Sequence, residues 1–163
     1  MRSAPKTAAR ITDGDAPRRP FDRDKKQRTK IYEWEGAWLE WNLNSITLAQ
    51  CRSIVRSACR LFGVRAPTVV QHKRASYSFY DPNKHQISMQ AVGKRGRGGK
   101  NRACVLHEAA HAIIHFKKPT VLDHGAYFAS VYVLLLAKAK IAPLSALTAS
   151  AAEFGIKFKC KNS

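Results

Sequence analysis

The chain has 163 residues, the size of one domain with short extensions. A hydrophobic share of 45% and a charged share of 25% are ordinary for a globular protein and exclude a chain that is disordered throughout. The charge balance is unusual, because 29 Lys and Arg against 11 Asp and Glu give a net charge of +18. Such a surface attracts polyanions, so we expect nonspecific nucleic acid or another polyanion among the partners.

The cysteines and the apolar segments indicate the compartment. No C-x-x-C pair is present, which argues against a zinc ribbon or finger, and the spacing is not typical of a disulfide framework. We see no signal peptide, and the longest apolar stretch, residues 131–137, is far shorter than a membrane span. We therefore expect no membrane association and an intracellular protein, cytoplasmic or nucleoid-associated, or a virion component if a phage encodes it. The cysteines are Cys51, Cys59, Cys104 and Cys160.

Three parts are expected along the chain. Residues 1–30 hold ten Lys and Arg, four Asp and almost no large apolar side chain, so they are predicted to form a disordered basic arm. Residues 31–155 form the predicted domain, and residues 156–163 form a basic tail that includes a short strand. The aromatic-rich segment 31–41 is predicted to be a helix whose tryptophans either pack in the core or face a partner. These are Trp34, Trp38 and Trp41.

A clearer helix follows the aromatic segment. Ser45 or Thr47 can cap its N-terminus, Gly63 can end it, and apolar residues recur on one face between Leu48 and Phe62. Arginines four residues apart lie on the other side, where they form either a solvated helix face or a stripe that contacts phosphates. These arginines are Arg52, Arg56 and Arg60.

Residues 68–90 are predicted to be β-structure. Strands at 68–71, 75–80 and 85–90, the last two joined by a turn that begins at Asp81, would make a small antiparallel sheet. A glycine-rich basic segment follows at 92–100, without the spacing of a phosphate-binding P-loop, and is either a plain surface loop or a contact for a polyanion. Its cations, with the next one along the chain, are Lys94, Arg95, Arg97, Lys100 and Arg102.

The C-terminal half is predicted to be helical over residues 102–116, 125–140 and 143–154. The first of these helices carries the most informative motif, His107-Glu-Ala-Ala-His111. Positions i and i+4 share one helix face, so both imidazoles can bind one Zn²⁺. Glu108 can face a water on the metal, whose pKa falls toward about 7, and take its proton during attack on a carbonyl. The alternative is two hydrogen-bonded histidines on a half-buried helix.

Two histidines leave such a site one protein ligand short. His115 lies eight residues after His107, about 12 Å along a helix, so one metal cannot bind both. Glu153 is the only downstream Glu and is better interpreted as a surface residue. His124 follows a short loop that contains Pro119 and begins the next helix, which can pack against the first. The predicted ligands of one zinc ion are His107, His111 and His124.

Neighbouring polar residues have weaker signals. Asp123 can orient a ligand imidazole or cap the helix that follows, and we favour the cap. Tyr127 and Tyr132 suit core packing, with stabilisation of an oxyanion as the alternative. His72 and His85 are expected on strands, without a metal role.

The segment from Val105 to Ala112, with His124-Gly-Ala-Tyr-Phe128 after a short linker, resembles the SprT-like zinc metallopeptidases. Those proteins pair an H-E-x-x-H helix with a third histidine in a following H-G-x-x-F/W segment. The order of the upstream elements is similar too, over about residues 31–155, and small metallohydrolases of this kind occur in actinobacteria and their phages. The resemblance implies a zincin-like fold with a small antiparallel sheet packed on the H-E-x-x-H helix, zinc on the three histidines, Glu108 as general base and peptidase activity.

Members of this family act as proteases on proteins bound to DNA, and the zinc ribbon of the longer members is not found in this chain. The sequence therefore predicts a zinc metallopeptidase of α+β fold that acts on a protein or peptide near nucleic acid. The alternative is a noncatalytic basic protein, structural or associated with nucleic acid as in a virion, in which zinc staples a zincin-like fold. The sequence does not indicate an oligomeric state.

Overall fold

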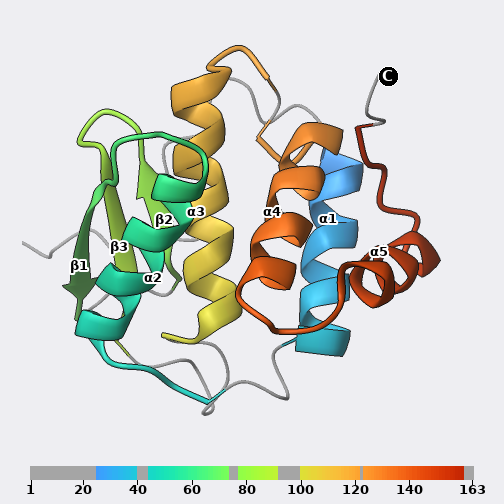
Figure 1. Ribbon diagram of the computed structural model, residues 1–163, viewed down its shortest axis with the longest axis horizontal. Helices are drawn as coiled ribbons and strands as arrows, with labels where there is room; N and C mark the ends of the chain where they lie inside the picture. The colour runs from blue at the N-terminus through green and yellow to red at the C-terminus, as the bar shows by residue number, and fades with distance from the viewer. Residues whose placement is uncertain (1–24, 40–43, 74–76, 92–99, 122, 160–163) are drawn as a thin grey trace, which may run out of the picture.

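The computed structural model describes residues 25–39, 44–73, 77–91, 100–121 and 123–159. Over these residues the chain is a mixed α/β protein in which the central helix α3 separates the sheet and α2 from α4, α1 and α5 (Figure 1). The helices are α1 (Lys25–Trp34), α2 (Leu48–Leu61), α3 (Arg102–Lys117), α4 (Ala126–Lys138) and α5 (Leu144–Glu153), with a π-helical segment η1 (Glu35–Leu39). The strands are β1 (Thr68–His72), β2 (Phe79–Asp81) and β3 (Gln86–Gln90).

The N-terminal helix begins before the predicted start of the domain. α1 starts at Lys25 rather than near Ile31, because Ile31 and Trp34 are both 1% exposed and anchor it in the core. The indole nitrogen of Trp34 donates to Ser150 Oγ at 2.9 Å, which ties α1 to α5. The core role predicted for Trp34 is therefore confirmed, whereas Trp41, the side chain of Trp38 and the arm up to residue 24 lie outside the described residues.

Helix α2 has the ends that the sequence predicts. The Thr47 side chain accepts from the Gln50 backbone N–H, and the Gln50 side chain accepts in return from the Thr47 backbone, which satisfies two otherwise open donors of the first turn. Gly63 takes a φ of +62°, a conformation that favours glycine, just after the helix. One face of α2 is buried, through Cys51, Val55, Ala58 and Cys59.

The sheet is mixed, and the prediction of an antiparallel sheet is wrong. β3 lies in the middle, antiparallel to β2 and parallel to β1. The chain reverses direction after β1 and again after β2, so β3 runs in the same direction as β1 and inserts beside it. The turn before β3 forms as expected, since Asp81 Oδ1 accepts from the backbone N–H groups of Asn83 and Lys84 at 3.0 and 3.3 Å.

The C-terminal part is helical as predicted, and α3 is its most buried element. Residues Val105 to Ile114 of this helix are all buried, between β2, β3 and α2 on one side and α4 on the other. Helix α4 is apolar, yet among the described residues no helix has the length and apolar character needed to cross a membrane.

The residues after α5 belong to the fold rather than to a separate tail. Ile156 is 5% exposed, and the backbone of Lys157 exchanges two hydrogen bonds with the Gln27 side chain, at 2.9 and 3.1 Å. Residues 156–159 form no strand, which corrects the predicted one, and Cys160 lies outside the described residues. The other three cysteines, Cys51, Cys59 and Cys104, are free thiols, in agreement with the prediction of a chain without a disulfide framework.

Candidate metal centre

The first two histidines of the site project from one face of α3. Asn101 begins this helix, because its side chain accepts from the Cys104 backbone N–H at 2.9 Å and satisfies a donor of the first turn. His107 and His111 follow about two and three turns later and are only 4% and 2% exposed. The i, i+4 spacing therefore places both imidazoles side by side in the interior, as predicted.

The third histidine comes from the segment that leads into α4. The chain leaves α3 at Lys118, and His124 precedes Gly125, the N-cap residue of α4. Because α4 packs against α3, His124 is brought back to the motif and is 5% exposed. The prediction that the chain returns to bring His124 to the motif is confirmed, although His124 lies in the turn before α4 and not on the helix itself.

The three imidazoles converge through the same type of atom. His107 Nε2 lies 3.2 Å from His111 Nε2 and 3.2 Å from His124 Nε2. All three residues are buried, and their ligand atoms lie within 4.8 Å of one another. Such a group of imidazoles could hold a metal ion.

A carboxylate fixes the tautomer of His107. Glu35 Oε1, in η1, lies 2.7 Å from His107 Nδ1. A carboxylate only accepts hydrogen bonds, so Nδ1 carries the proton and donates it. In the neutral imidazole Nε2 then carries a lone pair, which points toward the other histidines. Glu35 thereby prepares His107 as a ligand, in the way that carboxylates orient metal-binding histidines in general.

A second carboxylate lies beside His111. Asp123 Oδ1 is 3.4 Å from His111 Nδ1 and the residue is 9% exposed. Negative charge at this nitrogen favours the tautomer with the proton on Nδ1 and the lone pair on Nε2. The preferred prediction for Asp123, a helix cap, is wrong, because Gly125 is the N-cap of α4 and has no side chain to cap with. The alternative, orientation of a ligand imidazole, fits the geometry.

The spacing of these nitrogens fits a tetrahedral metal ion. Two nitrogens that each lie roughly 2.0–2.1 Å from one zinc ion are about 3.3 Å apart at a tetrahedral angle. The observed Nε2 separations of 3.2 Å match this value. The same separation also suits an N–H···N hydrogen bond between neutral imidazoles, so the spacing is compatible both with a bound metal ion and with a hydrogen-bonded histidine cluster.

Aromatic rings enclose the histidines. The Phe128 ring lies 4.9 Å from His107, 4.5 Å from His111 and 4.9 Å from His124, centroid to centroid. Tyr32 of α1 stacks on His107 at 5.5 Å with an interplanar angle of 14°, yet its side chain is 51% exposed. The centre is thus apolar on the inside and has Tyr32 between it and solvent.

Tyr127 and Tyr132, for which oxyanion stabilisation was the alternative to packing, both make other contacts. The Tyr132 hydroxyl donates to the Ala103 carbonyl at 3.3 Å, and burial together with the charge of Glu35 holds the pKa of Tyr132 well above its usual value of 10.0. Tyr127 faces cations, with Lys118 and Lys159 each 5.5 Å from its ring centre. The packing role was the favoured prediction for both.

Glu108 lies in the same buried stretch of α3. It is 6% exposed, follows the ligand His107 directly and is not one of the three residues whose ligand atoms converge. The role of Glu108 as a general base stays a prediction.

The other histidines lie away from this cluster. His115 is exposed and lies 5.9 Å from the Tyr80 ring, so it is not a ligand, as predicted. His85 contacts the Tyr80 hydroxyl through Nδ1 at 3.0 Å and the Arg65 carbonyl through Nε2 at 3.2 Å. His72 is exposed at the end of β1.

The predicted nucleic-acid contacts divide into separate groups. Lys94, Arg95 and Arg97 lie outside the described residues. Lys100 is only 9% exposed and donates from Nζ to the Ala91 carbonyl at 3.0 Å, so its assignment as a surface contact is wrong.

The remaining predicted cations are on helices. Arg102 donates from its guanidinium to the Ala139 carbonyl, which joins α3 to the end of α4. Arg52 donates from Nε to the Val69 carbonyl at 3.1 Å and so braces β1. Arg56 and Arg60 are exposed on α2. This exposure fits both predicted alternatives, a solvated helix face and a stripe that contacts phosphates.

Sequence reasoning missed Glu35 and Tyr32. The two residues lie three positions apart, which places them on one helix face, and Trp34 between them anchors that segment in the core. The available signal was a short acidic stretch, with Glu33, Glu35 and Glu40 and no Lys or Arg between residues 31 and 51. Glu35 and His107 are 72 residues apart, so no local pattern in the sequence connects them.

Comparison of the chain with family models, with curated proteins and with solved structures gives no match.

Proposed function

We propose that this chain is a zinc-dependent hydrolase of the peptidase type. The observation that carries the proposal is the convergence of three imidazole Nε2 atoms, with the Glu35 carboxylate bonded to His107 Nδ1 and the Asp123 carboxylate 3.4 Å from His111 Nδ1. This donor set suits zinc, which takes three protein ligands in catalytic sites and leaves a fourth position for water or substrate. Structural zinc sites have four protein ligands, whereas the described residues bring three together.

Each residue then has a defined task. His107, His111 and His124 would hold the ion, which lowers the pKa of a coordinated water to about 7 and polarises a carbonyl. Glu108 would take the proton of the attacking water and pass it to the leaving amine. Glu35 and Asp123 keep the lone pairs of His107 and His111 directed at the ion.

The peptide bond as the substrate rests on the resemblance to SprT-like peptidases. The packing of α3 against the strands β2 and β3 supports a zincin-like fold, since zincins place their H-E-x-x-H helix against a sheet. The charge of +18 and the exposed Arg56 and Arg60 support action close to a polyanion such as nucleic acid.

The test is the Glu108→Gln variant of the full chain. We expect it to bind one zinc per chain, like the wild type, and to cleave fluorescein-labelled casein about 100-fold to 10,000-fold more slowly, because general-base catalysis is lost and the ligands are not. Zinc is measured by mass spectrometry of the dialysed protein. Glu153→Gln is the control, since this glutamate is exposed on α5 and should leave the rate unchanged.

Two results would contradict the proposal. If Glu108→Gln retains zinc and cleaves as fast as the wild type, Glu108 is not the general base. If the zinc-loaded wild type cleaves no peptide bond but unfolds at a much lower temperature after chelation, the noncatalytic alternative, a zinc-stapled basic protein, is correct.

A further inference from the structure

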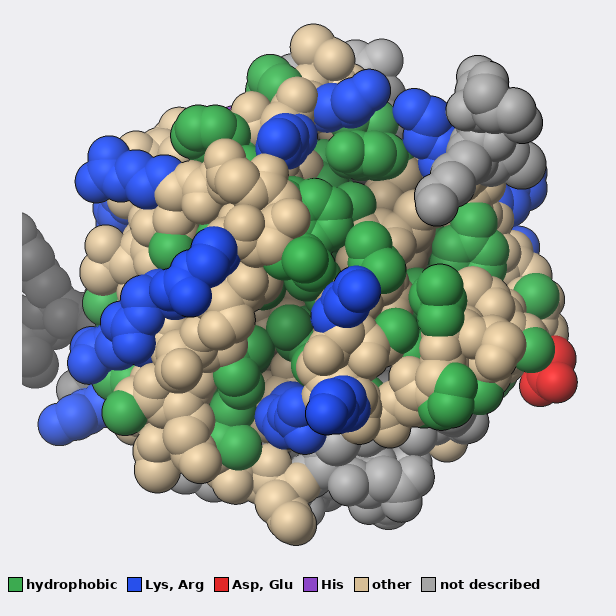
Figure 2. Space-filling view, in the orientation of Figure 1, with side chains coloured by type: hydrophobic (Ala, Val, Ile, Leu, Met, Phe, Trp, Pro, Cys, Tyr) green, Lys and Arg blue, Asp and Glu red, His purple; other side chains and the backbone are tan. Residues whose placement is uncertain are grey.

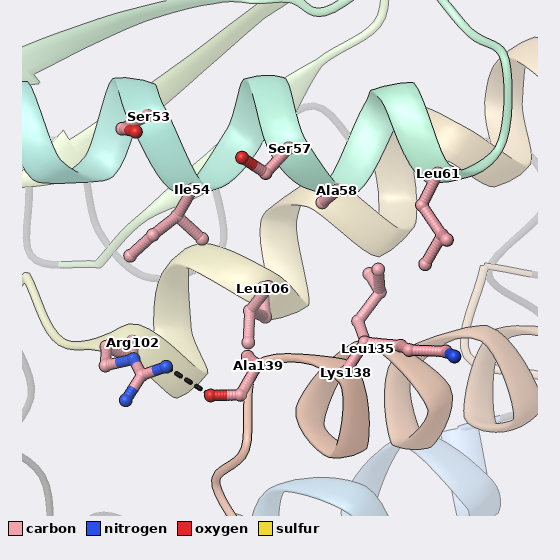
Figure 3. Close-up of a pocket in the computed structure, with 10 residues that line it drawn as sticks. All are labelled: Ser53, Ile54, Ser57, Ala58, Leu61, Arg102, Leu106, Leu135, Lys138 and Ala139. Carbon is pink, nitrogen blue, oxygen red and sulfur yellow. Dashed lines mark hydrogen bonds between the residues drawn. The ribbon is translucent and has the colours of Figure 1, made fainter.

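A groove lies on the side of α3 that faces α2. It has a volume of about 350 Å³ and is bordered by α2, α3 and the end of α4 (Figure 3). The histidines of the metal centre do not line it. Leu61 is 49% exposed at one end, an unusual position for a large apolar side chain. The apolar lining consists of Ile54, Ala58, Leu61, Leu106, Leu135 and Ala139.

Among the residues that the structure describes, both charged side chains that line this groove are cations. Arg102 and Lys138 line it, and the bond from Arg102 to the Ala139 carbonyl holds the guanidinium at its edge. Arg56 and Arg60 are exposed on α2 but are not among the lining residues, so the cations of the groove itself are Arg102 and Lys138. Figure 2 shows Lys and Arg side chains in a row on this face and around a central hollow with apolar walls.

The same three helices provide almost no negative charge to balance these cations. The sequences of α2 and α4 contain no Asp or Glu. The one acidic residue of α3, Glu108, is buried in the metal centre. The groove therefore combines an apolar floor with an unbalanced cationic rim, and such a rimmed apolar patch is typical of an interaction site.

This combination distinguishes between partners. Nucleic acid would use the cations and leave the apolar floor exposed, because its affinity comes mainly from phosphates. An amphipathic helix would use both features, with its apolar face on the floor and acidic residues toward the rim. The lining of α2 from Ser53 to Leu61 extends for about 12 Å, which is two turns of a partner helix with apolar residues at i, i+3 or i+4, and i+7.

We propose that the groove between α2, α3 and α4 binds an acidic amphipathic helix of a partner protein. This interaction does not depend on zinc or on Glu108. It gives the protein a second contact surface, on the other side of α3 from the metal centre.

The experiment selects ligands without assuming their sequence. A displayed library of random 16-residue peptides is panned on the immobilised full chain, in about 0.15 M salt to reduce exposed charge interactions. We expect the enriched peptides to contain Asp and Glu together with apolar residues at helical spacing. Synthetic peptides of the enriched sequences are then measured by fluorescence anisotropy against wild type and variants.

Two pairs of variants locate the binding. Leu61→Asp should lower the affinity for the peptides at least tenfold. Leu144→Asp should not, because Leu144 lies on α5, away from the groove, although at 46% it is similarly exposed. Lys138→Glu should weaken peptide binding about tenfold more than Arg65→Glu, because Lys138 is exposed and lines the groove whereas Arg65 is an exposed arginine outside it. Thermal melting confirms that each variant is folded.

The proposal is overturned if the enriched peptides are not acidic, or if Leu61→Asp and Leu144→Asp bind them equally. It is also overturned if a peptide of the same charge with its apolar residues dispersed binds as tightly, since charge alone would then explain the binding. Full competition by duplex DNA that Leu61→Asp does not affect would assign this face to nucleic acid. Concentration-dependent dimerisation that Leu61→Asp abolishes, without any peptide binding, would assign it to a second copy of the chain.

Discussion

On the side of α3 that meets η1 and α4, three histidines are buried together with the carboxylates Glu35, Glu108 and Asp123. On the side that meets α2, an open apolar groove has cations at its edge. The chain has only 11 acidic residues, and three of them are buried around the histidines. Burial of ionised carboxylates without a partner costs free energy, so their concentration beside three histidines supports the proposed metal ion.

The comparison also separates two uses of charge. The net charge of +18 suggests a polyanion partner, but it does not describe the interior of the protein, where the ionisable groups near His107 are acidic. Positive charge on the groove side acts at a distance and is sensitive to salt. Negative charge at the metal centre acts over single hydrogen bonds and is not screened in the same way.

The largest effect is expected from the loss of a ligand. His124→Ala should lower zinc affinity on the order of 1000-fold, because two histidines and water replace three histidines. Competition with a chromophoric chelator measures the affinity. His115→Ala is the matched control, as an exposed histidine of α3 outside the cluster, and should leave zinc affinity unchanged. Equal affinities of the two variants would remove His124 from the site.

Thiol reactivity tests the electrostatic difference between the two regions. Burial raises the pKa of Cys59 on α2 from 9.0 to about 11, and burial with the nearby charge of Glu108 raises that of Cys104 on α3 to about 12. A raised pKa keeps the thiol protonated, so at pH 8 the thiolate fraction falls about 100-fold for Cys59 and about 1000-fold for Cys104.

Alkylation of each thiol by iodoacetamide, followed by peptide mapping, should become faster as the pH rises, toward about 11 for Cys59 and toward about 12 for Cys104. Glu108→Gln should accelerate the alkylation of Cys104 and leave the alkylation rate of Cys59 unchanged. Acceleration of both thiols would mean that the variant loosens the fold instead of removing a charge.

The orienting carboxylate has a smaller effect than a ligand. Glu35→Gln should weaken zinc binding about tenfold to 100-fold, since the amide can still accept from His107 Nδ1 but no longer supplies a negative charge. Glu33→Gln, an exposed residue of α1, should change nothing. A Glu35→Gln variant with wild-type zinc affinity would show that Glu35 only packs against His107.

The smallest effect is expected from the cap of the groove helix. Thr47→Ala removes the side chain that accepts from Gln50 and should lower the free energy of unfolding by about 1 kcal/mol, without changing zinc affinity. Urea denaturation measures the first quantity and chelator competition the second. A parallel loss of zinc affinity would mean that the two sides of α3 are coupled.

Local patterns predicted most of the elements and the convergence of the three histidines. The caps at Thr47 and Gly63, the turn at Asp81 and the i, i+4 histidines depend on residues close in sequence, and the structure bears out each of them. His124 was accessible because the loop before it is short and α4 is strongly apolar.

Long-range pairing was not accessible in the same way. The insertion of β3 between β1 and β2 depends on the path of the chain. The alternation of apolar and polar residues along each strand is the same whether β3 lies in the middle or at the edge of the sheet. Glu35 reaches His107 only after α1 is placed by Trp34 on α5. In the sequence Lys100 is not distinguished from the basic residues around it. Its burial depends on the hydrogen bond from its Nζ to the Ala91 carbonyl, which composition does not reveal.

The sequence separations within the metal centre have a consequence for the order of folding. His107 and His111 are in one helix, and His124 is 17 residues from His107, whereas Glu35 is 72 residues away. Closing a short loop costs less conformational entropy than closing a long one. We therefore expect the α3–α4 hairpin to assemble its three ligands early, and the N-terminal helix to dock last, with Glu35 completing the shell around His107.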